Sequence, residues 1–308
     1  MPKNKIYLGY IFTISAAICW GFSGACGEFL FQHRNLNPEW ATMVRMLVTG
    51  SVMLPLLFIL KGRAVTLAPI KVAKDFIHLL IFAIIGLASC QYTYLAVIKH
   101  SNAGTGTMLQ YIGPVFVMIF MCMILRRLPK LMELVSIACV IIGVFFVATH
   151  GDPSTLIITP TALTIGIASA VALALYTVIP VRLIKLYGST LITAWAMFIG
   201  GITVAIIFRP SAGEEAIFDM GTYLGLAGLI LIGTLFSYTV FLYGVNLLGP
   251  LKASLLACIE PISAAFMTMF WFGTEFVVYD YIGFVLILLA VVLVSLTGGK
   301  DVDLDHEG

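Results

Sequence analysis

The chain has 308 residues, of which 61% are hydrophobic and only 10% are charged, and its formal net charge is +2. A soluble domain carries about 25% charged residues, so this composition excludes an ordinary soluble fold and predicts an all-α integral membrane protein. There is no long basic tract, and no nucleic-acid partner is expected. The six cysteines form no CxxC pair, so neither a metal nor another cofactor is expected.

Apolar runs between charged residues and Gly, Pro or Asn breaks predict ten transmembrane helices, because a span needs about 20 mostly apolar residues. The first run is too long for a signal-peptide core, which favours a retained span. Residues 299–308 after the last span are acidic, and we expect a disordered cytoplasmic tail there. The predicted spans are 7–31, 40–60, 76–98, 103–125, 131–149, 160–181, 189–208, 221–245, 250–272 and 278–297.

Lysine and arginine lie mainly on one side of this predicted topology. Thirteen of the 17 fall in segments on the same side as the N-terminus, three fall on the other side, and Arg45 lies within a span. Cytoplasmic segments are enriched in Lys and Arg. The distribution therefore predicts a multi-pass protein of the cell (plasma) membrane with both termini in the cytoplasm.

An internal repeat relates the two halves of the chain. Residues 103–114 align with 250–261 at a separation of 147 residues, with Leu, Ile and Pro identical at three positions. The same separation relates Glu133 to Asp280. We predict two five-helix repeats, residues 1–150 and 151–298, and the odd helix number inverts the second repeat in the membrane. Inverted repeats are typical of secondary transporters.

Several short motifs follow one another along the chain: Trp20-Gly21, Val44-Arg45-Met46-Leu47, Pro114, Pro261 and Gly273-Thr274-Glu275. In this order they resemble the EamA-like ten-helix branch of the drug/metabolite transporter superfamily, and the resemblance covers residues 10 to 297. It implies a central cavity lined by the first, third, fourth, sixth, eighth and ninth spans, with the fifth and tenth spans at the far end. It also implies transport of small polar metabolites, amino acids among them, often as export.

The chain departs from the family pattern at one place. After the fourth span it reads Leu125-Arg126-Arg127, with no glutamate to match Glu275 in the second half. A role for that acid in both halves is therefore not expected.

Glu260 is the leading candidate for chemistry. It lies about eleven residues into the ninth predicted span, or roughly 16 Å along a helix, which is close to the membrane midplane. Ionisable groups inside a span are costly and commonly functional. Pro261 follows it directly and leaves a helix carbonyl without its partner, as Pro114 does in the first half. We expect Glu260 to bind a substrate ammonium group or to couple transport to a proton. The alternative is a structural glutamate whose hydrogen bonds only join neighbouring helices.

Arg45 is the second charged candidate within a span. Its planar guanidinium suits a substrate carboxylate. The resemblance places the second span beside the cavity, however, and this favours a structural arginine that pairs with helix-end carbonyls or with Glu28. Glu28 itself is expected near the outer end of the first span, solvated or paired.

Aromatic and amide side chains on the predicted cavity helices complete the candidate binding site. Aromatic walls with a few polar groups are typical of small-molecule sites, although such residues also pack ordinary membrane-protein cores. The candidates are Trp20, Gln91, Tyr94, Gln110, Tyr111, Tyr176 and Tyr238.

The leading hypothesis is a secondary carrier that alternates access around a midplane site and is not an enzyme. The alternatives are an intramembrane transferase acting on a lipid-linked substrate, a channel, or a carrier of the same superfamily that imports amines, nucleosides or sugars. The sequence contains no HExxH and no Gly-rich nucleotide loop. Expected partners are a small-molecule substrate, membrane lipid and a coupled proton or counter-substrate, and the chain is expected to be a monomer or homodimer.

Overall fold

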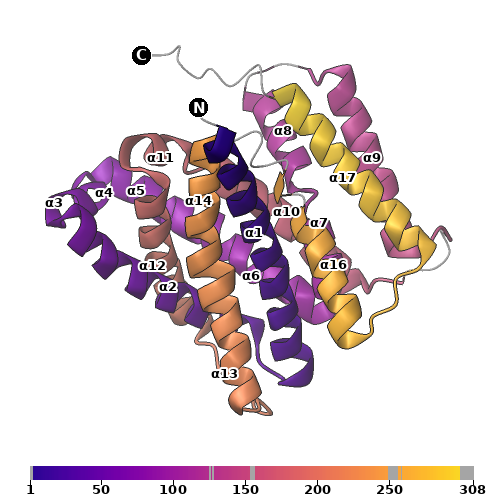
Figure 1. Cartoon of the computed structure of the whole chain (residues 1–308), viewed down its shortest axis with the longest axis horizontal. Coiled ribbons are helices and arrows are strands. Elements are labelled where there is room, and N and C mark those ends of the chain that lie inside the picture. Colours follow the sequence, from indigo (N-terminus) through magenta and orange to yellow (C-terminus); the bar gives the residue numbers. More distant parts are fainter. Residues whose placement is uncertain are drawn as a thin grey trace.

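A computed structural model of the chain describes residues 3–124, 126, 128–152, 157–248, 256–257 and 259–298. Within these ranges the regular secondary structure is entirely helical, and the helices form one bundle (Figure 1). The predicted cytoplasmic tail, 299–308, and the first residues of the ninth predicted span lie outside the described residues.

The described first half contains two π-helical segments. One extends the first α-helix, and the other joins two successive α-helices. The elements in chain order are α1 (Lys3–Glu28), η1 (Phe29–His33), α2 (Pro38–Lys61), α3 (Arg63–Thr66), α4 (Ala68–Lys71), α5 (Ala73–Ile81), η2 (Phe82–Ala88), α6 (Ser89–His100), α7 (Ala103–Gln110), α8 (Gly113–Ile124) and α9 (Leu131–Thr149).

The second half has a similar course, with one π-helical segment inside a long helix. Its elements are α10 (Pro160–Val178), α11 (Val181–Tyr187), α12 (Ser189–Phe208), α13 (Met220–Ala227), η3 (Gly228–Phe236), α14 (Ser237–Leu248), α16 (Ile259–Phe272) and α17 (Val278–Gly298).

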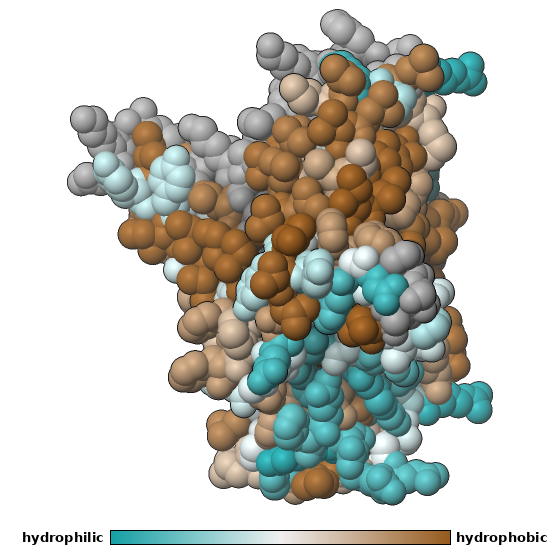
Figure 2. Space-filling view, turned by 90° about the vertical axis from the view of Figure 1, so that its right-hand side faces the viewer, coloured by the Kyte–Doolittle hydropathy of each residue, from teal (hydrophilic) through white to brown (hydrophobic). Residues whose placement is uncertain are grey.

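Seven helical stretches of the described chain are long and apolar enough to cross a membrane, and three shorter apolar helices accompany them. Each of these stretches coincides with one of the predicted spans. The chain is therefore a multi-pass membrane protein. Figure 2 shows the surface that this produces, with a hydrophobic upper part and a hydrophilic area gathered in the lower part of one side.

The span predicted over 103–125 is interrupted next to Pro114, one of the two prolines named as helix breaks from the sequence. α7 ends at Gln110, Tyr111 and Ile112 form a turn, and α8 begins at Gly113. Pro114 is the second residue of α8, and its missing N–H cannot bond the carbonyl of Gln110, four residues earlier. The helix therefore restarts at this point, where a proline is well tolerated.

Helices from the two halves pack against each other in matching pairs. α2 packs along α12, and α9 packs along α17. α1 packs on α14 and α16, and α10 packs correspondingly on α6 and α8. Figure 1 shows α9 and α17 together at one edge of the bundle, with α2 and α12 toward the opposite edge.

Glycine sets the spacing of both outer pairs. A Cβ on Gly50 of α2 would lie 2.6 Å from the Phe198 nitrogen of α12. A Cβ on Gly283 of α17 would lie 2.6 Å from the Gly143 carbonyl oxygen of α9. The backbones approach so closely at both points that a side chain would separate the helices.

Two local structures recur at the 147-residue separation found in the sequence. That separation carries η2, residues 82–88, onto residues 229–235, which lie within η3. It also relates two buried carboxylates that cap the N-termini of α9 and α17. Glu133 accepts the Lys130 backbone N–H at 2.6 Å, and Asp280 accepts the Val277 N–H at 2.9 Å.

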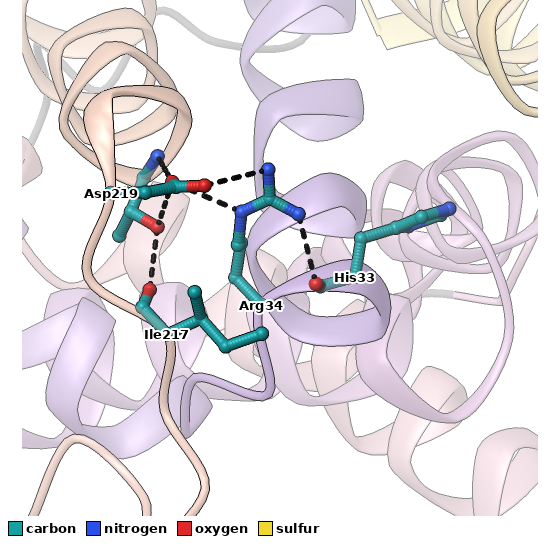
Figure 3. Close-up of polar contacts among 5 residues, drawn as sticks. His33, Arg34, Ile217 and Asp219 are labelled. Carbon is teal, nitrogen blue, oxygen red and sulfur yellow. Dashed lines mark hydrogen bonds and ion pairs between the residues drawn. The ribbon is translucent and has the colours of Figure 1, made fainter.

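Ion pairs join the halves at both ends of the bundle. At one end Arg34, which follows η1, binds Asp219 before α13 through two contacts of 3.0 and 3.1 Å (Figure 3). At the other end Arg182 donates to Asp75 at 2.7 Å. The Thr222 backbone N–H, together with Arg34, holds the pKa of Asp219 below its ordinary value.

Candidate functional site

Glu260 lies in the first turn of α16 and is half-buried. Its carboxylate accepts a hydrogen bond of 3.0 Å from the Tyr111 hydroxyl, which also contacts the Ala257 carbonyl oxygen at 2.7 Å. Tyr111 occupies the turn between α7 and α8, so the helix break in the first half brings a donor to the acid of the second half. Of the two carboxylate oxygens, only one has a hydrogen-bond partner among the described residues.

Arg45 is almost fully buried, with 3% of its surface exposed. Its Nε donates to the Thr234 hydroxyl of η3 at 2.7 Å, and Nη2 lies 3.5 Å from the Gly233 carbonyl oxygen. Nη1 is buried and has no hydrogen-bond partner in the described part of the chain. The guanidinium also lies close enough to Glu260 for an electrostatic interaction. Arg45 therefore retains an unused donor.

The structure brings three of the predicted aromatic residues together on one side. Trp20 of α1 packs edge-on against Tyr238 of α14, with ring centroids 5.4 Å apart. The hydroxyl of Tyr238 interacts with that of Tyr176 on α10 and lies 3.5 Å from the Gln91 amide nitrogen. Trp20 Nε1 is buried with no partner among the described residues. Four helices thus converge on one aromatic and polar cluster.

Two other predicted residues mainly join neighbouring helices. The Tyr94 hydroxyl of α6 lies 3.1 Å from the Thr107 hydroxyl of α7. The Gln110 amide donates to the Ser169 hydroxyl of α10 at 2.9 Å and lies 3.7 Å from the Cys90 sulfur. Their polar groups are already bonded, so they support the site more than they offer free contacts to a substrate.

The burial of Glu28 differs from the sequence-based expectation. It was expected to be solvated or paired at a helix end, and it is in fact 1% exposed. Its carboxylate accepts the Ala103 backbone N–H at 2.8 Å and the Thr268 hydroxyl at 2.9 Å. It therefore caps α7 and joins α1 to α16. Arg45 does not pair with it, because Arg45 turns to η3 instead.

The polar partners Thr107, Ser169 and Thr234 could not be found from the sequence. Each is a small hydroxyl residue in an apolar run, and such residues are common in membrane helices without any site nearby. Only the packing of distant helices reveals them. Among the described residues no group of three or more His, Cys, Asp or Glu side chains could hold a metal ion.

The apolar helical bundle and its membrane-length helices define a multi-pass membrane protein. The model of the EamA-like transporter family matches residues 7–149 and again residues 160–296. The chain therefore belongs to the EamA-like transporter family, and the predicted family resemblance is confirmed.

Relatives cover nearly the whole chain. An uncharacterized inner membrane transporter of Salmonella typhimurium, YicL, is 34% identical over 94% of this chain and 95% of its own length. An uncharacterized transporter of Clostridium kluyveri is 24% identical, with 96% of each chain covered. A crystal structure with 14% identity superimposes with a TM-score of 0.57, covering 96% of this chain and 99% of that chain, and shares the fold. Family and relatives together identify a membrane transporter.

Proposed function

We propose that this transporter is a secondary carrier of small polar metabolites that bear an amine, with amino acids as the best-fitting class. The observation that carries the proposal is that Glu260 and Arg45, which interact electrostatically, each retain unused hydrogen-bonding capacity. A free amino acid presents an ammonium group and a carboxylate. It can therefore engage both side chains at once.

Each end of such a substrate has a suitable partner. The ammonium group binds the Glu260 carboxylate, and the adjacent ring faces of Trp20 and Tyr238 favour a cation. The substrate carboxylate binds the Arg45 guanidinium, whose planar fork matches its geometry. When the substrate leaves, Glu260 takes up either a proton or the ammonium group of a counter-substrate in its place. Transport of the substrate is thereby coupled to transport of the proton or of the counter-substrate.

The packing supports alternating access between two inverted five-helix repeats, 1–150 and 151–298. An inverted pair related by a twofold axis should repeat its contacts with the halves exchanged. The pairing of α1 with α14 and α16, and of α10 with α6 and α8, follows that pattern. Two further pairs of features follow the same pattern: the π-helical segments η2 and η3, and the N-terminal caps formed by Glu133 and Asp280. The two matches of the family model also support the repeat.

We further propose ten spans, a plasma-membrane location and both termini in the cytoplasm. The distribution of lysine and arginine supports this orientation. The family resemblance favours export as the direction, and a monomer or homodimer as the working unit.

The test is transport by Glu260→Gln in reconstituted vesicles. Substrates come first from a thermal-shift screen of the purified protein against amino acids, amines, nucleosides and sugars, followed by counterflow of each hit. Glu260→Gln keeps the size of the side chain and removes its charge, so counterflow should fall to the level of empty vesicles while the yield of folded protein is unchanged.

The matched control is Glu215→Gln, an exposed acid in the loop before α13. It should transport like the wild type. Full counterflow by Glu260→Gln, with the wild-type dependence on pH, would overturn the assignment of Glu260. Hits confined to sugars or nucleosides would overturn the amine-bearing substrate class.

A further inference from the structure

A cavity that none of the predicted site residues lines lies at the end of the bundle where α2 begins and α6 and α12 end. It has a volume of about 520 Å³. Its lining brings the basic side chains of Lys99, His100 and Arg209 together with a single acid, Glu39. Two fixed cations and a histidine therefore face one carboxylate, and the cavity favours an anion.

The basic groups of this cavity are largely available to a ligand. Arg209 and His100 are exposed, and neither has an ion-pair partner in the described ranges. Lys99 donates only to the Asn37 amide oxygen, at 3.1 Å. The carboxylate of the one acid, Glu39, already accepts a hydrogen bond of 3.1 Å from the Tyr92 hydroxyl.

Exposed apolar side chains adjoin this cavity at the end of α12. Ile206, Ile207 and Phe208 are the last residues of that helix, and all three are exposed. Phe208 also lines the cavity and packs against Tyr92, with centroids 5.2 Å apart. Ile165 of α10 lines the cavity as well. An exposed apolar helix end therefore lies next to a cluster of cations.

This arrangement matches the two parts of a phospholipid. A phosphate group needs cationic donors at the level of the membrane interface, and acyl chains need exposed apolar side chains below it. Water-soluble anions would use the cations but would gain nothing from the isoleucines of α12.

We propose that this cavity binds the phosphate of an anionic phospholipid through Lys99, His100 and Arg209, with the acyl chains against the exposed apolar end of α12. The site is separate from the transport site at Glu260. It holds α2, α6 and α12 together, and so joins the first half of the chain to the second.

Native mass spectrometry of the full chain, released from nanodiscs of equal phosphatidylglycerol and phosphatidylethanolamine, tests the site. The wild type should retain phosphatidylglycerol in preference to phosphatidylethanolamine. The double variant Lys99→Gln, Arg209→Asn should retain at least fivefold less phosphatidylglycerol. Asn is chosen because Arg209 has a positive φ of 43°, which Asn tolerates. Lys185→Gln, an exposed cation on α11, is the control and should match the wild type.

A second measurement separates a lipid from a free anion. Phosphatidylglycerol should raise the unfolding temperature of delipidated protein, and inorganic phosphate at the same concentration should not. Arg209→Asn alone keeps the contact between Lys99 and Asn37, and it should still weaken retention if the double variant misfolds. Equal retention of both lipids, unchanged retention by the variants, or equal stabilisation by inorganic phosphate would each overturn the proposal.

Discussion

Glu28 and Glu260 are both acids inside the helical bundle, yet their surroundings are opposite. Glu28 is 1% exposed, and it accepts hydrogen bonds from α7 and from α16. Glu260 is half-buried and accepts only the Tyr111 hydroxyl among the described side chains. A carboxylate whose bonds are satisfied by its own protein stabilises the fold, whereas one with free capacity can bind a ligand.

The same contrast separates Arg45 from the other arginines that the structure pairs. Arg34 and Arg182 both meet carboxylates. Arg45 is buried against a hydroxyl and a carbonyl, with Nη1 unpartnered in the described chain. Arg45 and Glu260 are therefore the groups on which substitution should affect transport before stability.

After Glu260→Gln, the largest effect should come from Arg45→Gln. It removes the cation for a substrate carboxylate, so counterflow of an amino acid should fall more than tenfold, the loss expected for a charged contact of about 1.5–3 kcal/mol. Counterflow of the corresponding amine without the carboxylate should fall much less. Equal losses for both substrates would show that Arg45 only supports the fold.

Glu28→Ala should act mainly on stability. It leaves the Ala103 N–H and the Thr268 hydroxyl buried without a partner, at a cost of about 1–3 kcal/mol for each group. The unfolding temperature should fall clearly, while counterflow per folded molecule stays near the wild-type value. Glu28→Gln retains an accepting oxygen and should lose less stability. Normal stability with lost transport would reverse the roles given to Glu28 and Glu260.

Tyr111→Phe should produce a smaller change. It removes the one hydrogen bond to Glu260, which is worth about 1 kcal/mol, and counterflow should change by roughly fivefold. Tyr223→Phe, an exposed tyrosine of α13, is the matched control. An unchanged rate together with an unchanged pH profile would remove Tyr111 from the site.

The smallest effect is expected outside the membrane-spanning helices, at Asp219. Because its pKa is lowered in the folded protein, its contribution to stability is present above the ordinary aspartate pKa of about 4 and is lost as the pH falls through the folded value. Asp219→Asn should therefore unfold at a slightly lower temperature than the wild type at pH 7. The difference should shrink in acid, and a constant difference would contradict the role of the charge.

Hydropathy was sufficient to predict most of the fold. Each long apolar run became helix, because a lipid-facing backbone must satisfy its own hydrogen bonds. Pro114 marked the interruption after Gln110, but a proline alone does not say whether a helix bends or stops. The π-helical segments have no residue signature, and they were missed entirely.

The sequence could name the candidate site residues but not their contacts. Glu260 stood out because an acid in an apolar run is costly. Arg45 carries the same signal, but its partner Thr234 lies 189 positions along the chain, and no pattern in a single sequence joins them. Glu28 was misjudged for the same reason, because its partners belong to helices that meet only in the folded bundle.

The close contacts at Gly50 and Gly283 restrict how this protein can be engineered. Replacing helical glycine with alanine commonly adds about 1 kcal/mol of helix stability, and it is an obvious route to a sample that survives purification. At these two positions the added methyl would lie 2.6 Å from the backbone of the facing helix. A thermostable version of the transporter would need substitutions at other positions, with the α2–α12 and α9–α17 contacts left unchanged.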